Sequence, residues 1–144
     1  MQPIMQAKGV VKRYLGTQAL KGVDFDVWPG RVNALIGENG AGKSTLMKIL
    51  AGIEKPTEGH LFLEGKEVHF SGAREAGELG VGIIHQELNL FRDMTVADNM
   101  FAGHEIARFG VIDRGEQRRR AKEVLTRLQQ DIDPNELMLN LRVG

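Results

Sequence analysis

Residues 37–45 carry the spacing G-x-x-x-x-G-K-[ST], which is typical of loops that bind phosphate groups. Gly40 and Gly42 allow successive backbone N–H groups to turn toward an anion without clashes of a Cβ atom. A helix that starts at the end of this loop adds unpaired N–H groups and the positive end of its dipole. A glycine-rich turn that binds nothing is the alternative, but such a turn does not require Lys43 and Ser44 at this offset.

The side chains of this P-loop (residues 37–45) have separate expected roles. Lys43 places its ammonium near the β- and γ-phosphates of a nucleotide, the Ser44 hydroxyl can ligate Mg²⁺, and Thr45 can reach the α-phosphate. The backbone of the loop supplies the remaining donors, from Gly37, Asn39, Gly40, Ala41 and Gly42. A histidine-based metal site is not expected, because the four histidines are scattered along the chain.

The elements on either side of the P-loop fit the arrangement that the motif needs. The apolar run 32–36 before it predicts a buried strand. The apolar positions of 46–50 after it predict one face of a helix, which we expect to end at Gly52. Strand, glycine loop and helix in this order predict the core of a phosphate-binding α/β domain.

Further strands and helices are predicted by periodicity and by turn residues. The expected strands lie at 4–14 and 23–27, in a hairpin of 61–63 and 68–70, and in a buried run at 81–84. Ser71 is expected to cap a short helix through Leu79, and Thr95 a second one that ends at Gly103.

The longest predicted helix begins at the pair Asp113 and Glu116, which have the spacing of a capping box, and ends near Gln130. Its expected apolar stripe consists of Ala121, Val124, Leu125 and Leu128. Its expected i,i+4 ion pairs are Glu116–Arg120 and Glu123–Arg127.

Composition excludes several classes of protein. The chain has 144 residues, 19 basic and 19 acidic side chains and no cysteine, which argues against disulfides, thiolate metal sites and bulk attraction to nucleic acid. The basic run 118–120 lies among acidic residues and is expected to be a solvated helix face. Neither a membrane span nor a signal peptide is expected from the sequence, so the protein is predicted to be soluble and cytoplasmic.

Three motifs resemble the ATPase subunits of ABC transporters, and the resemblance runs over essentially the whole chain. Residues 37–52 look like the Walker A segment of that family. Residues 84–90 resemble the Q-loop of one subgroup, the sugar importers of the ribose, galactose and xylose type. Residues 95–103, and 110–113 leading into the arginine-rich helix, resemble the same subgroup. Its members usually carry two tandem ATPase halves, and this chain resembles the first.

The resemblance implies roles for two more residues. Tyr14 falls where the family places an aromatic ring that stacks on adenine, although a strand-end tyrosine that packs on the core is the alternative. Gln86 falls at the Q-loop glutamine, whose carbonyl can ligate Mg²⁺ or orient water. ATP and Mg²⁺ are therefore the implied cofactors, with Lys43 and Gln86 catalytic and Ser44 and Gln86 as metal ligands.

The resemblance also implies partners and a location. The family contacts the transmembrane permease subunits through the Q-loop and the helical subdomain, pairs with a second ATPase domain in a head-to-tail dimer, and works indirectly with a periplasmic sugar-binding protein. No nucleic-acid partner is expected. The implied location is cytoplasmic, peripheral on the inner face of the bacterial cell membrane.

The expected fold is α/β: the P-loop NTPase core of an ABC ATPase with an N-terminal antiparallel β element and the start of a helical subdomain, truncated before Walker B. Residues 1–144 form a partial nucleotide-binding domain, about 1–92 for the β element, P-loop core and Q-loop and about 93–144 for the helical part. The final residues 141–144 resemble the first part of an ABC signature, with Arg142 where the family has serine. Because no Walker B segment follows, we expect this chain alone to hydrolyse ATP negligibly.

The resulting functional prediction is ATP binding, with hydrolysis in the complete subunit, to energise carbohydrate import through an ABC transporter. Two alternatives stay open at this point: an ATP-binding fragment without turnover, and a soluble ABC ATPase that acts on ribosomes or DNA. A P-loop kinase is not supported, because nothing in the sequence indicates a phosphoacceptor site or the arginines of a lid.

Overall fold

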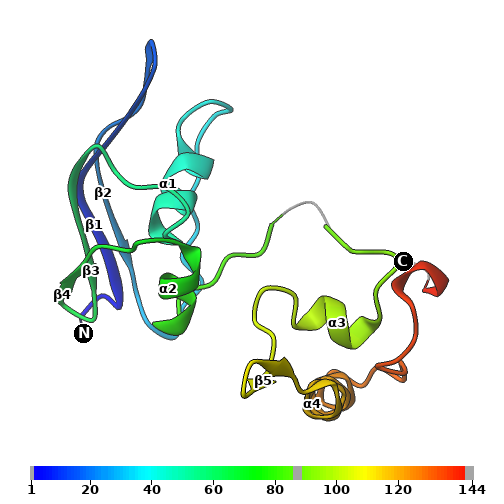
Figure 1. Cartoon of the computed structure of the whole chain (residues 1–144). Coiled ribbons are helices and arrows are strands. Elements are labelled where there is room, and N and C mark those ends of the chain that lie inside the picture. Colours follow the sequence, from blue (N-terminus) through cyan, green and yellow to red (C-terminus); the bar gives the residue numbers. More distant parts are fainter. Residues whose placement is uncertain (1, 86–88, 142–144) are drawn as a thin grey trace. The chain divides into compact units, whose positions relative to one another are not determined.

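The computed structural model describes residues 2–85 and 89–141 of the chain. The chain divides into two compact units, Met1–His85 and Gln86–Gly144 (Figure 1). Each unit has its own secondary structure, and each is described by itself below.

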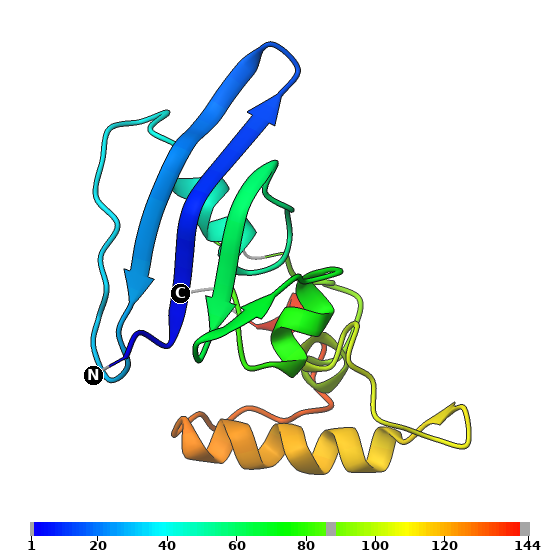
Figure 2. The ribbon, with the colours of Figure 1, turned by 90° about the vertical axis from the view of Figure 1, so that its left-hand side faces the viewer.

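The first unit is built on a four-stranded antiparallel sheet. Its strands are β1 (Met5–Tyr14), β2 (Thr17–Val27), β3 (Glu58–Leu63) and β4 (Lys66–Val68), in the order β2-β1-β3-β4. Figure 2 shows β1 between β2 and β3. The strands expected at 4–14 and 23–27 are confirmed. The hairpin of β3 and β4 is confirmed too, and its two-residue turn has the left-handed φ values that such turns favour, but its second strand is 66–68 rather than the expected 68–70.

One helix covers the inner face of this sheet. Helix α1 (Lys43–Leu50) buries Leu46, Ile49 and Leu50 against apolar side chains of the strands. The strand residues in this core are Met5, Ala7, Val10, Leu20 and Leu61. Gly52, with φ of 70°, follows the end of α1, as the sequence predicts. This packing fixes the helix, and with it the loop that precedes the helix.

Close contact between two glycines joins β1 to β3. Gly9 has φ of 58° and lies at a break in the pairing register of β1 with both neighbours. Gly59 has φ of 93°, and a Cβ atom on it would lie 2.5 Å from the carbonyl oxygen of Gly9. Only a residue without a side chain at position 59 permits the two backbones to come this close.

The predicted strand at 32–36 is wrong. The segment forms no strand in the described residues, and the side chains of Val32 and Ile36 are 99% and 90% exposed. Asn33 explains the start of the segment, because its amide group bonds both backbone groups of Trp28 at 3.1 Å and so closes a local turn. Of this run, Leu35 packs against the core.

The predicted strand at 81–84 is wrong as well. Val81 donates its N–H to the carbonyl of Ala76 at 2.8 Å, so the start of the segment closes the preceding helix instead of pairing with a strand. Ile84 is 99% exposed. Apolar runs indicate burial, but a strand also needs a neighbour for its backbone bonds, and residues 2–85 place none beside either segment.

Helix α2 (Ala73–Glu78) begins one residue later than predicted, because its N-cap is not the expected Ser71. Gly72 is the N-cap, and Ser71 precedes it. The N–H and the hydroxyl of Ser71 both donate to the Glu75 carboxylate at 2.7 Å. Ser71 therefore holds the helix start through Glu75 rather than by accepting a backbone N–H.

The second unit is mainly helical. It contains α3 (Val96–Met100), the two-residue strands β5 (Ala107–Arg108) and β6 (Val111–Ile112), α4 (Arg114–Arg127) and a 3₁₀ helix, Met138–Asn140. The two caps that the sequence predicts are confirmed: Thr95 accepts from the N–H of Asp98, and Asp113 from that of Glu116. Within the described ranges no helix is long and apolar enough to cross a bilayer.

The surface of α4 agrees with its predicted pattern in part. Ala121 and Leu125 are buried, whereas Val124 is 36% and Leu128 61% exposed, so the apolar stripe is narrower than expected. Glu116 pairs with Arg120 at 2.8 Å, as predicted.

The second ion pair that the sequence predicts on α4 has a different partner. Glu123 pairs with Arg119 of the preceding turn rather than with Arg127. Arg119 and Arg120 remain more than half exposed, which agrees with a solvated basic face.

Candidate phosphate-binding site

The backbone of the P-loop turns through two left-handed glycines before α1 begins. Gly40 and Gly42 have φ of 85° and 86°, a region that residues with a side chain rarely adopt. The N–H of Ala41 donates to the carbonyl of Glu38 at 3.2 Å, which closes the turn. Gly42 is the N-cap of α1 and has no side chain to cap it, so the first N–H groups of α1 are open to an external acceptor.

Strand β2 supports the end of this loop. A Cβ atom on Gly42 would lie 2.5 Å from the carbonyl oxygen of Ala19 and 2.6 Å from Cδ2 of Leu20. Because one of these atoms belongs to the backbone of a strand, a side chain at position 42 could not be accommodated without shifting the sheet. The end of the loop thus packs directly against the same sheet that α1 covers.

The ammonium of Lys43 lies across the loop. Its Nζ donates to the carbonyl oxygens of Gly37 and Glu38, each at 2.7 Å. An ammonium has three N–H donors, so one donor remains for an acceptor outside the loop. This geometry holds a positive charge beside the open N-terminus of α1.

The two hydroxyl side chains of the P-loop lie on the first turn of α1. Ser44 is exposed and Thr45 is half-buried. An exposed hydroxyl at this position can supply one oxygen to Mg²⁺, which takes its other ligands from phosphates and water. In the described ranges no three His, Cys, Asp or Glu side chains are grouped to hold a metal by themselves.

Tyr14 lies beside this turn of α1. It is the last residue of β1, opposite Thr17, and is 44% exposed. Its hydroxyl donates to the carboxylate of Glu54, and this bond is the main reason that the pKa of Tyr14 is raised. The hydroxyl of Thr45 acts on the same group and lowers the pKa by less. The structure therefore brings Tyr14 next to the P-loop, with its hydroxyl committed to Glu54.

Sequence reasoning missed two residues of this neighbourhood, Lys12 and Glu54. Lys12 Nζ lies 3.4 Å from the Glu54 carboxylate and 5.2 Å from the centre of the Tyr14 ring. Lys12 is two positions before Tyr14 and so lies on the same face of β1, which is a signal that could have been used. Glu54 has no comparable signal, because it reaches Tyr14 only after α1 has folded onto the sheet.

Two predicted features cannot be located. Gln86 and residues 142–144, which include Arg142, lie outside the described residues. Their expected roles stay predictions from the sequence.

Comparison with known proteins agrees with the resemblance seen in the sequence. A family model described as "ABC transporter" matches residues 20–141. The chain is 46% identical over 144 residues to the ribose import ATP-binding protein RbsA 1 of Rubrobacter xylanophilus, and 49% identical over 142 residues to RbsA of Rhodopirellula baltica. These alignments cover 100% and 98% of the chain, but only 29% and 28% of the relatives. The chain thus spans less than a third of their length.

Solved structures give the same fold. A nucleotide-free ATP-binding cassette from an ABC transporter superposes with a TM-score of 0.81 at 24% identity, covering 98% of this chain and 60% of that one. The ATP-binding cassette MJ0796, in a dimeric post-hydrolysis state bound to ADP and Pi, gives 0.70 at 25% identity and covers 96% and 63%. The expected α/β cassette fold is therefore confirmed for this chain.

Proposed function

Since the chain belongs to the ABC transporter family, we propose that its P-loop binds the phosphates of ATP together with Mg²⁺. One observation carries the proposal: the Lys43 ammonium is held by the loop carbonyls with one donor to spare, beside the open N-terminus of α1. A polyphosphate needs several converging donors and positive charge, and this arrangement supplies both.

Each residue has one task in the proposed site. The backbone N–H groups of the loop, from Asn39 to Gly42, surround the β-phosphate, and Lys43 donates to the β- and γ-phosphate oxygens. Thr45 reaches the α-phosphate, and the Tyr14 ring stacks on adenine. Ser44 would supply one ligand to Mg²⁺, and the family resemblance implies Gln86 as a second; the ion would offset charge on the phosphates. The protein's contribution to phosphoryl transfer is thus mainly positioning and charge stabilisation.

In the whole protein, we propose, ATP binding and hydrolysis energise import of a carbohydrate. The relatives named above are ribose import ATP-binding proteins, and the dimeric cassette supports a head-to-tail pair of ATPase domains. The permease would contact the Q-loop and the helical part, about 93–144, on the inner face of the cell membrane. Residues of about 1–92 would carry the nucleotide. The sugar itself is not specified by these residues.

Equilibrium binding of a fluorescent ATP analogue with Mg²⁺ tests the proposed site. Lys43→Ala should reduce the affinity by at least about tenfold, because it removes the charge and the closing bonds of the loop. Lys21→Ala, which removes an exposed lysine of β2, is the matched control and should bind like the unchanged chain. Equal affinity of the Lys43 variant and the unchanged chain would contradict the proposal.

A further inference from the structure

Glu54 connects strand β1 to helix α1 next to the P-loop. It follows the end of α1, and its Oε2 accepts from the Tyr14 hydroxyl and lies 3.4 Å from Lys12 Nζ, both on β1. Its Oε1 lies 3.7 Å from Nζ of Lys48, in α1. Only 22% of the Glu54 side chain and 16% of the Lys12 side chain are exposed. Charged groups that are covered to this degree need such partners to offset their lost hydration.

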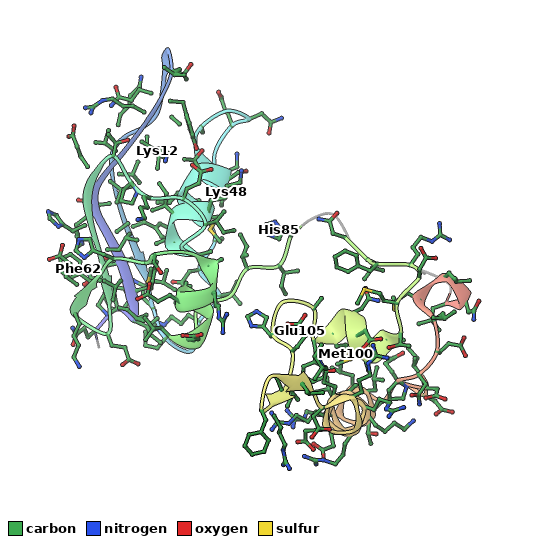
Figure 3. The ribbon with its side chains drawn as sticks, in the orientation of Figure 1. Lys12, Lys48, Phe62, His85, Met100 and Glu105 are labelled. Atoms are coloured by element: carbon green, nitrogen blue, oxygen red, sulfur yellow. The ribbon has the colours of Figure 1, made fainter. Side chains whose placement is uncertain are left out.

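Lys12 is held as tightly as Glu54. Its ammonium donates to the carbonyl of Lys55 at 2.7 Å, pairs with Glu54, and lies 5.2 Å from the centre of the Tyr14 ring, within the range of a cation–π contact. Figure 3 shows Lys12 at the β1–β2 hairpin and Lys48 on α1. One face of the Tyr14 ring therefore has a fixed cation against it, while almost half of the residue stays exposed.

We propose that Glu54 and Lys12 are positioning residues for the nucleobase: they hold the Tyr14 ring by its hydroxyl and one face, so that the other face can stack on adenine. The inference rests on the proposed function and deepens it, because it names what fixes the stacking surface. A ring that is already held loses little rotational freedom when the base arrives, so more of the stacking energy appears as affinity.

The ionisation of the pair supports this arrangement. The bond to Glu54 raises the pKa of Tyr14, and the same bond is the main cause that keeps the pKa of Glu54 below its ordinary value. The tyrosine therefore stays a donor and the carboxylate stays an acceptor through neutral pH. The surface beside the P-loop is thus constant over the range in which a nucleotide would bind.

Two probes that share a triphosphate chain test the proposal: Mg²⁺-ATP, which carries adenosine, and Mg²⁺-tripolyphosphate, which does not. The affinity of each is measured in competition with a fluorescent ATP analogue. Tyr14→Phe keeps the ring and removes the hydroxyl, and Glu54→Gln removes the charge. Each should weaken ATP about threefold to tenfold and leave tripolyphosphate unchanged. The double variant should lose no more than either single one, because both break the same contact.

Glu58→Gln is the matched control. It removes a carboxylate that pairs with Arg13, the neighbour of Tyr14 on β1, rather than with Tyr14 itself. This variant should bind both probes like the unchanged chain.

Tyr14 is the only tyrosine of the chain, so its ring protons can be followed without ambiguity by NMR. Addition of ATP, and not of tripolyphosphate, should move them upfield as the base stacks. In Glu54→Gln this shift should be smaller at saturation.

The possible results separate the two proposals. ATP affinity unchanged in Tyr14→Phe and Glu54→Gln would overturn the positioning role and leave the P-loop proposal intact. An equal loss for ATP and tripolyphosphate would also overturn it, because Glu54 would then act on the loop or the fold. If Lys43→Ala left the affinity for tripolyphosphate unchanged, the proposed function itself would be overturned.

Discussion

Glu116 shows how a single carboxylate can organise the first turns of a helix. It lies 2.7 Å from Arg119 and 2.8 Å from Arg120, one turn further along α4. The bond to Arg119 is the main cause that lowers its pKa from 4.5 to about 2, with Arg120 second. Because the folded pKa lies below the unfolded one, the stabilisation is complete above 4.5 and is lost as the pH falls toward 2.

Replacement of this residue should therefore change how the helix responds to acid. We expect the helix signal of α4, followed by backbone NMR, to weaken between about pH 4.5 and about pH 2, and Glu116→Gln to flatten that dependence. Glu78→Gln, which removes the more exposed Arg74–Glu78 pair of α2, is the control and should leave the α4 profile unchanged. If the pH dependence of the α4 signal were the same in Glu116→Gln, Glu116 would not be the group that stabilises this helix above pH 4.5.

Residues that act through local spacing were predictable, and residues that act through the fold were not. The glycines of the P-loop, Lys43 and the Thr95 cap each follow from a pattern of a few positions. Glu54 reaches Tyr14 across 40 positions of the chain, so no local pattern indicates the contact.

At the level of elements, the pairing of β1 with β3 depends on Gly59. Its Cβ would meet the Gly9 carbonyl at 2.5 Å and the Lys8 carbonyl at 2.7 Å, and both are backbone atoms that a side-chain rotation cannot remove. Gly59→Ala should destabilise the first unit by about 1–3 kcal/mol, measured by urea unfolding.

Gly77→Ala provides the control for that measurement, because a Cβ there meets nothing within 4 Å. Its site is helical, so alanine should be neutral or should stabilise by up to about 1 kcal/mol. Equal free energies of unfolding for the two variants would mean that the close approach of β1 and β3 at Gly59 does not determine the stability of the first unit.

The antiparallel elements were predicted well because each carries its own signal. The two-residue turn at Glu64–Gly65 and the alternation in 23–27 are local. The runs 32–36 and 81–84 were predicted as strands from their apolar character alone, and their pairing would have to come from other segments. Periodicity reports which residues prefer burial, but it does not report which neighbour is available.

For the whole molecule, these two runs leave apolar side chains in contact with solvent. Val32 and Ile84 are each 99% exposed, and unpaired backbone beside such residues favours association between chains. We expect the chain to self-associate as its concentration rises, seen as a growing sedimentation coefficient. The double variant Val32→Lys with Ile84→Lys should remain smaller under the same conditions.

The control for self-association is Leu15→Lys. Leu15 is equally exposed, but it lies in the turn between the paired strands β1 and β2, so this change should have little effect. A sedimentation coefficient that stays constant over the whole concentration range in the unchanged chain would contradict the prediction.

The contact of Gly42 with β2 has a consequence for protein engineering. A substitution at this glycine would report on nucleotide binding only if the scaffold survived it. Here a side chain at position 42 would collide with Ala19 and Leu20 of the sheet. Both the packing of the sheet and the proposed binding of phosphate therefore require a residue without a Cβ atom at this position. Loss of binding in a Gly42 variant would therefore be uninformative, and the flexible side chain at position 43 is the better place for a binding-deficient reference protein.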